Sequence, residues 1–380
     1  MASEKRALIL DIDSSSLGAC IVEFQDKPVL VDVKRMPLGT GTNREPEALI
    51  PQLREALGAV VPSYAKKHPG ITDVFVVAAS PWFAATLRTL ASKSERPVRV
   101  SRSSIQRIVS DHRKTEHDAA GHAALEVLPV TVLVNGYRSM VSKPVMGTAL
   151  AVTLYESFSD TSFVQTVTDA VRSSIGKAHI SWHTTPLAYT ETLLRLSDED
   201  HATVVDVGGE VTDVVVLSHQ TVAFVGSIPI GSRTIARALQ GTGGLADSMS
   251  RLSLFARGEL AEKEMQATAA ALTTASAEWQ KQFAAALDQA GNSVPVPHRV
   301  FVVGERDELP WFTQVLMGTS VRGQRPLPTV VNADYFAGTV TFGDGGVFDA
   351  SLVLDALFFH MRGGRLKTDW PTAPVLYSVQ

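Results

Sequence analysis

Residues 202–217 read ATVVDVGGEVTDVVVL, which is an apolar run, an aspartate (Asp206), a pair of glycines and a second apolar run. Residues 7–22 read ALILDIDSSSLGACIV and have the same layout, with Asp11 at the end of the first run and serines in the turn. Short β-branched runs bounded by small residues indicate strands joined by a tight turn. The two aspartates are 206 − 11 = 195 residues apart. We therefore expect an internal duplication, with two related units facing a shared cleft.

Around these hairpins, short strand-like runs alternate with longer helical stretches, which is typical of an α/β protein. A 3.6-residue period predicts a helix over residues 45–67, and Asn135-Gly136 between two apolar runs predicts a tight hairpin. Four parts are expected: a first domain from residues 1–84 and 158–185, an inserted small α+β subdomain at 85–157, a second domain at 186–350, and a C-terminal helix and tail at 351–380.

The C-terminal segment allows two interpretations. Residues 347–361 are apolar at helical spacing and are followed by the basic residues Arg362, Arg365 and Lys367. Such a stripe with a basic end is compatible with a helix on a membrane surface. We expect instead a last core-packing helix, because basic residues are also favoured at the C-terminal end of any helix.

The composition excludes several classes of protein. The chain has 380 residues, a hydrophobic fraction of 45% and a net charge of −4, so it is neither disordered nor a general nucleic-acid binder. A single cysteine, Cys20, cannot form an intramolecular disulfide or a cysteine-rich zinc site. No apolar run approaches the ~18 residues of a membrane span, and Asp11 interrupts the N-terminal run before it reaches the length of a signal peptide. We expect a cytoplasmic protein without a transmembrane segment.

The duplicated turns have the chemistry of a phosphate site. Turns of glycine and serine leave backbone N–H groups uncovered, and such groups bind phosphate oxygens. An aspartate beside them can hold Mg²⁺ through water while the metal bridges the phosphates. A single Asp-Gly-Gly turn, taken alone, favours an ordinary hairpin, but two such turns in order favour a polyphosphate clamp. A third motif, the strand 298–304 that ends at Gly304, allows a base or ribose to approach the backbone closely.

The order of these motifs resembles the phosphate and adenosine elements of the actin, heat-shock chaperone and sugar kinase ATPase superfamily, and more narrowly the FtsA/PilM branch of bacterial actin-like proteins. Three short motifs carry the narrower resemblance: Pro186-Leu187-Ala188-Tyr189, Leu196-Ser197-Asp198-Glu199-Asp200 and Ile228-Pro229-Ile230-Gly231-Ser232. Residues 128–150 look like the small subdomain that this branch inserts. The resemblance spans residues 7–318.

This resemblance implies duplicated actin-like (ribonuclease H-like) α/β domains around a nucleotide cleft, with ATP and Mg²⁺ as cofactors. It places Mg²⁺, through water, at Asp11 and Asp206. The nucleotide-binding residues that it implies are Asp11, Ser14, Ser15, Ser16, Asp206, Gly208, Gly209, Thr212, Asp213 and Gly304, with Asp247 and Arg251 nearest to the adenine-flanking pair.

Three acidic residues depart from the family pattern. Asp13 stands in the first turn where the branch has glycine, Glu210 stands in the second turn, and Glu305 follows Gly304. A carboxylate in a phosphate cradle repels phosphate unless a metal ion lies between them. The hypothesis is that nucleotide binding is weak or absent.

The resemblance implies a cytoplasmic scaffold or an ATP-dependent switch at the inner membrane, with weak ATPase activity as an open question. Such a protein links a membrane assembly, for cell division or for a type IV pilus or secretion machinery, to partner proteins. The expected partner is the cytoplasmic tail of a membrane protein, and self-association into dimers or filaments is the other expected contact. A structural scaffold that binds no nucleotide and a sugar-kinase-like phosphotransferase are the alternatives, the latter disfavoured by the small middle subdomain.

Overall fold

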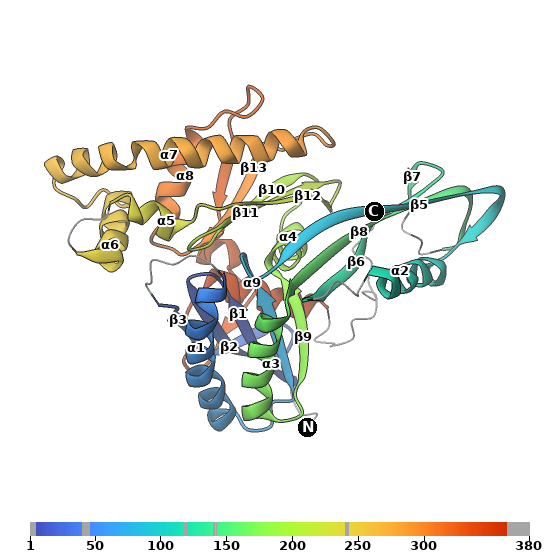
Figure 1. Ribbon diagram of the computed structural model, residues 1–380, viewed down its shortest axis with the longest axis horizontal. Helices are drawn as coiled ribbons and strands as arrows, with labels where there is room; N and C mark the ends of the chain where they lie inside the picture. The colour runs from blue at the N-terminus through green and yellow to red at the C-terminus, as the bar shows by residue number, and fades with distance from the viewer. Residues whose placement is uncertain are drawn as a thin grey trace.

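The structure is a computed structural model, and it describes residues 5–39, 46–116, 121–139, 141, 143–239 and 243–362. The expected tail after Arg362, including Arg365 and Lys367, lies outside these residues. Figure 1 shows two sheets stacked at the centre of the molecule and a third sheet that projects as an arm.

The two central sheets repeat one topology. The first sheet has the order β15-β3-β2-β1-β4-β9 and the second the order β12-β11-β10-β13-β14. In each, the strand that carries the aspartate pairs antiparallel with the next strand and parallel with the fourth. The strands of the first sheet are β1 (Lys5–Ile12), β2 (Ser16–Phe24), β3 (Pro28–Pro37), β4 (Asp73–Ala78), β9 (His179–Thr184) and β15 (Thr341–Phe342). Those of the second are β10 (Ala202–Val207), β11 (Thr212–Ser218), β12 (Thr221–Ile228), β13 (Arg299–Gly304) and β14 (Leu327–Val330). The predicted duplication is confirmed.

Helices cover both outer faces and fill the space between the sheets (Figure 1). α1 (Pro46–Lys67) and α3 (Thr161–Ile175) pack on the outer face of the first sheet. α4 (Thr185–Leu196) and α9 (Ala350–Met361) lie between the two sheets. The second sheet is covered by α5 (Ser232–Arg237), α6 (Gly244–Ala256), α7 (Glu262–Ala290) and α8 (Leu309–Met317).

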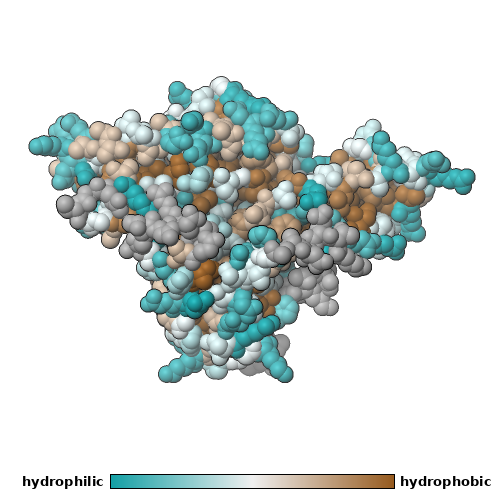
Figure 2. Space-filling model, viewed as in Figure 1, coloured by the Kyte–Doolittle hydropathy of each residue, from teal (hydrophilic) through white to brown (hydrophobic). Residues whose placement is uncertain are grey.

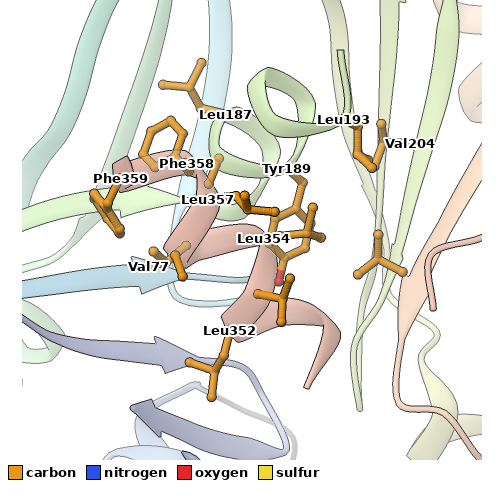
Figure 3. Close-up of a cluster of buried hydrophobic side chains, with 14 of the residues drawn as sticks. Val77, Leu187, Tyr189, Leu193, Val204, Leu352, Leu354, Leu357, Phe358 and Phe359 are labelled. Atoms are coloured by element: carbon orange, nitrogen blue, oxygen red, sulfur yellow. The ribbon is translucent and has the colours of Figure 1, made fainter. Parts of the chain in front are cut away.

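The core between the sheets is built around α9. Figure 3 shows its side chains between Val77 of the first sheet and Val204 of the second. Phe359 stacks on Phe75 with ring centroids 3.8 Å apart. Residues 352–359 are all buried, and burying each large apolar side chain contributes ~1.5–3 kcal/mol. Residues 352–359 of the C-terminal apolar stripe therefore form a core-packing helix, as expected, and are not available to a membrane surface.

The arm is a four-stranded antiparallel sheet, β5 (Ala84–Val100), β6 (His122–Val134), β7 (Tyr137–Arg138) and β8 (Val145–Asp160), with α2 (Arg102–Glu116) beside it. Figure 2 shows it as a separate lobe. Asn135 and Gly136 have φ of 53° and 83°, so the predicted tight hairpin is confirmed. Within residues 5–362, leaving aside the gaps given above, no helix is both long and apolar enough to cross a membrane.

Candidate functional site: a cleft closed by its own side chains

The two aspartates line one cleft between the sheets. The cleft has a volume of about 1110 Å³, and Asp11 at the end of β1 and Asp206 at the end of β10 both border it. Ser16, Gly208 and Gly304, all predicted from the sequence, line the same space. The carboxyl ends of the strands that pair in parallel meet at one edge of an α/β sheet, which is where such folds place their ligand sites.

The carboxylate of Asp13 lies within the first turn and binds groups that would otherwise be free. Its Oδ2 accepts hydrogen bonds from Ser15 N at 3.2 Å and Ser15 Oγ at 2.5 Å, and its Oδ1 accepts one from Ser14 Oγ at 3.1 Å. The same Oδ2 accepts a hydrogen bond from Gly209 N, in the turn of the other sheet, at 3.3 Å. One carboxylate therefore joins the two turns.

Other contacts bring the two turns together directly. Glu210 N donates to Ser14 Oγ at 3.0 Å. Arg233, at the start of α5, donates through Nη2 to the carbonyl oxygen of Ser15 at 2.8 Å. A Cβ on Gly209 would lie only 2.3 Å from Ser15 Cβ, so glycine is needed for this approach. These contacts leave no room for a phosphate between Ser15 and Gly209.

A guanidinium group stands beside Asp11. Arg35 of β3 donates through Nη2 to Asp11 Oδ2 at 2.6 Å, and through Nε to Oδ2 of Asp349 at 2.6 Å. Its Nη1 donates to Ser16 Oγ at 2.9 Å. Gly18 lies between Asp11 and Arg35 in the sheet register, and a Cβ there would be 2.7 Å from Arg35 Nη2. The small residue on β2 thus allows the arginine to reach across to β1.

The carboxyl groups of the cleft are poorly solvated. Burial raises the pKa of Asp11 to about 6, although the Arg35 charge opposes this effect. Burial, together with the charges of Asp213 and Asp13, raises the pKa of Asp206 well above its usual range.

Seven predicted site residues do not line the cleft. Thr212 donates to the carbonyl oxygen of Ile230, and Asp213 accepts from Ser80 Oγ and Ser227 Oγ. On α6, Arg251 donates to Thr268 Oγ1, and the carboxylate of Asp247 lies against Gly243. Ser14, Ser15 and Gly209 lie at the contact of the two turns rather than on the open cleft.

Three acidic residues depart from the family pattern and were expected near the phosphates, and Glu210 is the one that lies elsewhere. Its carboxylate accepts hydrogen bonds from both terminal nitrogens of Arg237, at 2.6 and 2.5 Å, and one from Thr234. It does not line the cleft, so its charge is compensated within the second domain. Asp13 and Glu305 do line the cleft.

The arrangement does not fit a magnesium-bound polyphosphate. The backbone amides of Ser15 and Gly209, which would bind phosphate oxygens, already donate to Asp13. The carboxylate of Asp11, which would hold the metal through water, is paired with Arg35. Among the described residues, no group of three or more His, Cys, Asp or Glu side chains has the geometry to hold a metal ion. The half of the cleft beside Gly304 remains open.

Sequence reasoning missed Arg35, Asp349 and Arg233. The signal for Arg35 was present, because the register of three successive strands aligns Asp11, Gly18 and Arg35. Asp349 is 314 residues from Arg35, and no local pattern links the two.

Comparison with solved structures supports this description of the fold. No protein-family model matches the sequence, and no curated protein is similar to it. A chain of a PilM-PilN type IV pilus biogenesis complex is similar over 94% of this chain and 98% of its own length, with a TM-score of 0.61 and 18% sequence identity. EutJ from Carboxydothermus hydrogenoformans matches with a TM-score of 0.43 and 12% identity, over 93% of this chain and 89% of its own. The cytoplasmic domain of EpsL, an inner-membrane component of the type II secretion system of Vibrio cholerae, matches over 96% and 98% with a TM-score of 0.37 and 10% identity. The last two scores are too low to carry an argument.

The chain therefore has the actin-like α/β fold, with duplicated domains around a cleft. Within that class, its similarity to the PilM-PilN complex covers 94% of the chain, and the expected likeness to the PilM type is confirmed at the level of the fold.

Proposed function

We propose that this protein is an actin-like scaffold that binds a short cytoplasmic tail of a membrane protein and thereby joins an inner-membrane pilus or secretion assembly to cytoplasmic partners. The observation that carries the proposal is the end-to-end similarity to the PilM-PilN complex, at a TM-score of 0.61.

The surface of the arm supports a role in protein contacts. Near its end, Tyr137 is 80% exposed and Met146 is 57% exposed. β5 forms one edge of the arm sheet over 17 residues and is exposed along most of its length. Apolar side chains and an unpaired strand edge are the features with which proteins bind extended peptides.

A scaffold is favoured over an ATP-dependent switch by the closed turns. A switch would need free amides for the phosphates, and those of Ser15 and Gly209 are already used. No contact of the described residues favours the sugar-kinase alternative. ATP and Mg²⁺, with Asp11 and Asp206 as metal residues, remain the competing hypothesis.

Cross-linking on membranes tests the proposed partner. Cells that make the full chain are treated with a lysine-reactive cross-linker, and the products are identified by mass spectrometry. We expect Lys93 and Lys143 of the arm, both exposed, to link to the cytoplasmic tail of a membrane protein, and Lys27 at the opposite end of the first sheet to give no such link. A synthetic peptide of that tail should then bind the purified protein and not a Tyr137→Glu/Met146→Glu variant. Recovery of the protein without any membrane-protein cross-link would contradict the proposal.

A further inference from the structure

The Asp13 carboxylate occupies a site built for an anion. Turns of small residues present backbone N–H groups that bind phosphate oxygens in many proteins. Here the donors to Asp13 are two backbone amides, Ser15 N and Gly209 N, and two hydroxyls, Ser14 Oγ and Ser15 Oγ. A carboxylate offers the same kind of acceptor oxygen as a phosphate. The anion in this cradle therefore comes from the chain itself.

The Arg35 guanidinium occupies the place of a cation. It lies against the carboxylates of Asp11 and Asp349 and the hydroxyl of Ser16. Burial tends to lower the pKa of Arg35, but the two carboxylates outweigh this effect and hold it well above the usual range. The group is therefore permanently charged, and unlike a bound metal ion it cannot dissociate.

The Asp13 carboxylate and the Arg35 guanidinium each join elements that are distant in the sequence. Asp13 of the first domain binds Gly209 of the second, and Arg35 of β3 binds Asp349 just before α9. Arg233 of the second domain adds hydrogen bonds to the carbonyl oxygens of Ser15 and Leu38 in the first, at 2.8 and 2.9 Å. In each contact the partners are far apart in sequence and come from separate elements around the cleft.

We propose that Asp13 and Arg35 are internal substitutes for the phosphate and the metal ion of an actin-like cleft. Asp13 holds the two turns together without a nucleotide, and Arg35 joins the first turn to the segment before α9. The closed arrangement is then a fixed property of the chain. A Mg²⁺-nucleotide cannot open or close it, because side chains of the protein itself occupy its anion and cation positions. This inference does not depend on the identity of any membrane partner.

Amide hydrogen exchange of the second turn tests this proposal. The variants are Asp13→Ala, which removes the carboxylate, and Asp13→Asn, which keeps its shape and removes its charge. Asp26→Ala, at an exposed turn of the same domain, is the matched control. The readout is the exchange of residues 207–211, which are distant in sequence from the substitution. A change there reports the contact between turns and not the flexibility of residue 13 itself.

We expect Asp13→Ala to speed exchange of this turn about tenfold or more, the effect of losing one hydrogen bond to a charged group. Asp13→Asn should give an intermediate rate and Asp26→Ala the wild-type rate. In the wild-type protein, about 1 mM Mg-ATP should leave exchange of both turns unchanged. The proposal is overturned if residues 207–211 exchange at the wild-type rate in both Asp13 variants, or if Mg-ATP slows their exchange in the wild-type protein. Should Asp13→Ala fail to fold, the Asp13→Asn rate alone decides.

Discussion

Replacing Arg35 by methionine removes the only cation beside Asp11 and Asp349 among the described residues while keeping an apolar stem of similar length. Leaving a buried carboxylate without its partner costs about 3–5 kcal/mol. The Arg35 side chain is 21% exposed and that of Asp11 is 2% exposed, so solvent screens the pair only in part. We expect a loss of about 3 kcal/mol, at the lower end of that range, near neutral pH.

The size of this loss should depend on pH. In the wild-type protein the pKa of Asp11 is about 6, above the value of 3.8 for an ordinary aspartate, because burial outweighs Arg35. Removing Arg35 raises that pKa further, so the folded variant holds its proton to higher pH than the unfolded chain does. The gap in stability between variant and wild type should therefore widen as pH rises from about 5 to 8.

Urea unfolding followed by tryptophan fluorescence measures both effects, because Trp82 Nε1 donates to the backbone oxygen of Asp13 beside the cleft. Arg54→Met, at an exposed position of α1, is the control and should leave stability unchanged. An Arg35→Met protein within about 0.5 kcal/mol of wild type, with a parallel pH profile, would refute the assigned role of Arg35.

Three further outcomes follow from single contacts. Gly18→Ala places a methyl group 2.7 Å from Arg35 Nη2, and we expect urea unfolding to show a loss of about 1–3 kcal/mol; an unchanged midpoint would contradict the close approach. Burial raises the pKa of Asp213 to about 6, so its folded form keeps a proton that the unfolded form releases, and this group lowers stability as pH rises from about 4 to 6. In urea titrations over this pH range, the Asp213→Asn variant should lose up to about 3 kcal/mol less unfolding free energy than the wild-type protein. Parallel pH profiles for the two proteins would contradict the raised pKa of Asp213. Asp355 is fully buried, and its carboxylate has no hydrogen-bond partner among the residues that the structure describes. Asp355→Asn should therefore raise the thermal midpoint at pH 8, which corresponds to a gain in stability of about 1 kcal/mol or more, whereas a lower midpoint would show a partner that the carboxyl needs.

The sequence predicts the two central sheets because their signals are local. Each hairpin ends its first apolar run with an aspartate and a turn of small residues, and the duplication follows from comparing Asp11 with Asp206. Asn135-Gly136 has the positive φ angles that its hairpin requires, which other residues adopt less easily. In these cases backbone preference and hydrophobic pattern agree.

Two long elements were not predicted. β5 has few buried positions and a register shift between Lys93 and Val98, so no clear alternation marks it. α7 has only a weak signal, because Leu272, Trp279 and Phe283 are buried at helical spacing among alanines and threonines. An edge strand exposed to solvent on much of its surface leaves little pattern for a single sequence to reveal.

For the cleft, the sequence identifies the groups but not their pairing. Asp13 could be recognised as a carboxylate in a phosphate turn, and the structure adds that it binds Gly209 across the cleft. The partners of Arg35 lie 24 and 314 residues away, and their contact depends on the packing of α9 between the sheets. The sequence alone does not show whether a carboxylate in such a turn repels phosphate or stabilises the turn. The difference depends on hydrogen-bond donors from other elements, such as Gly209 N for Asp13.

The most direct test of the account is a calorimetric titration of the wild-type protein with Mg-ATP near neutral pH. The amides of Ser15 and Gly209 are occupied by Asp13, and Asp11 is occupied by Arg35. We expect no saturable binding up to about 1 mM nucleotide. A dissociation constant of about 1 μM that depends on Mg²⁺ would contradict the closed arrangement, because the turns would then have to open for the phosphates.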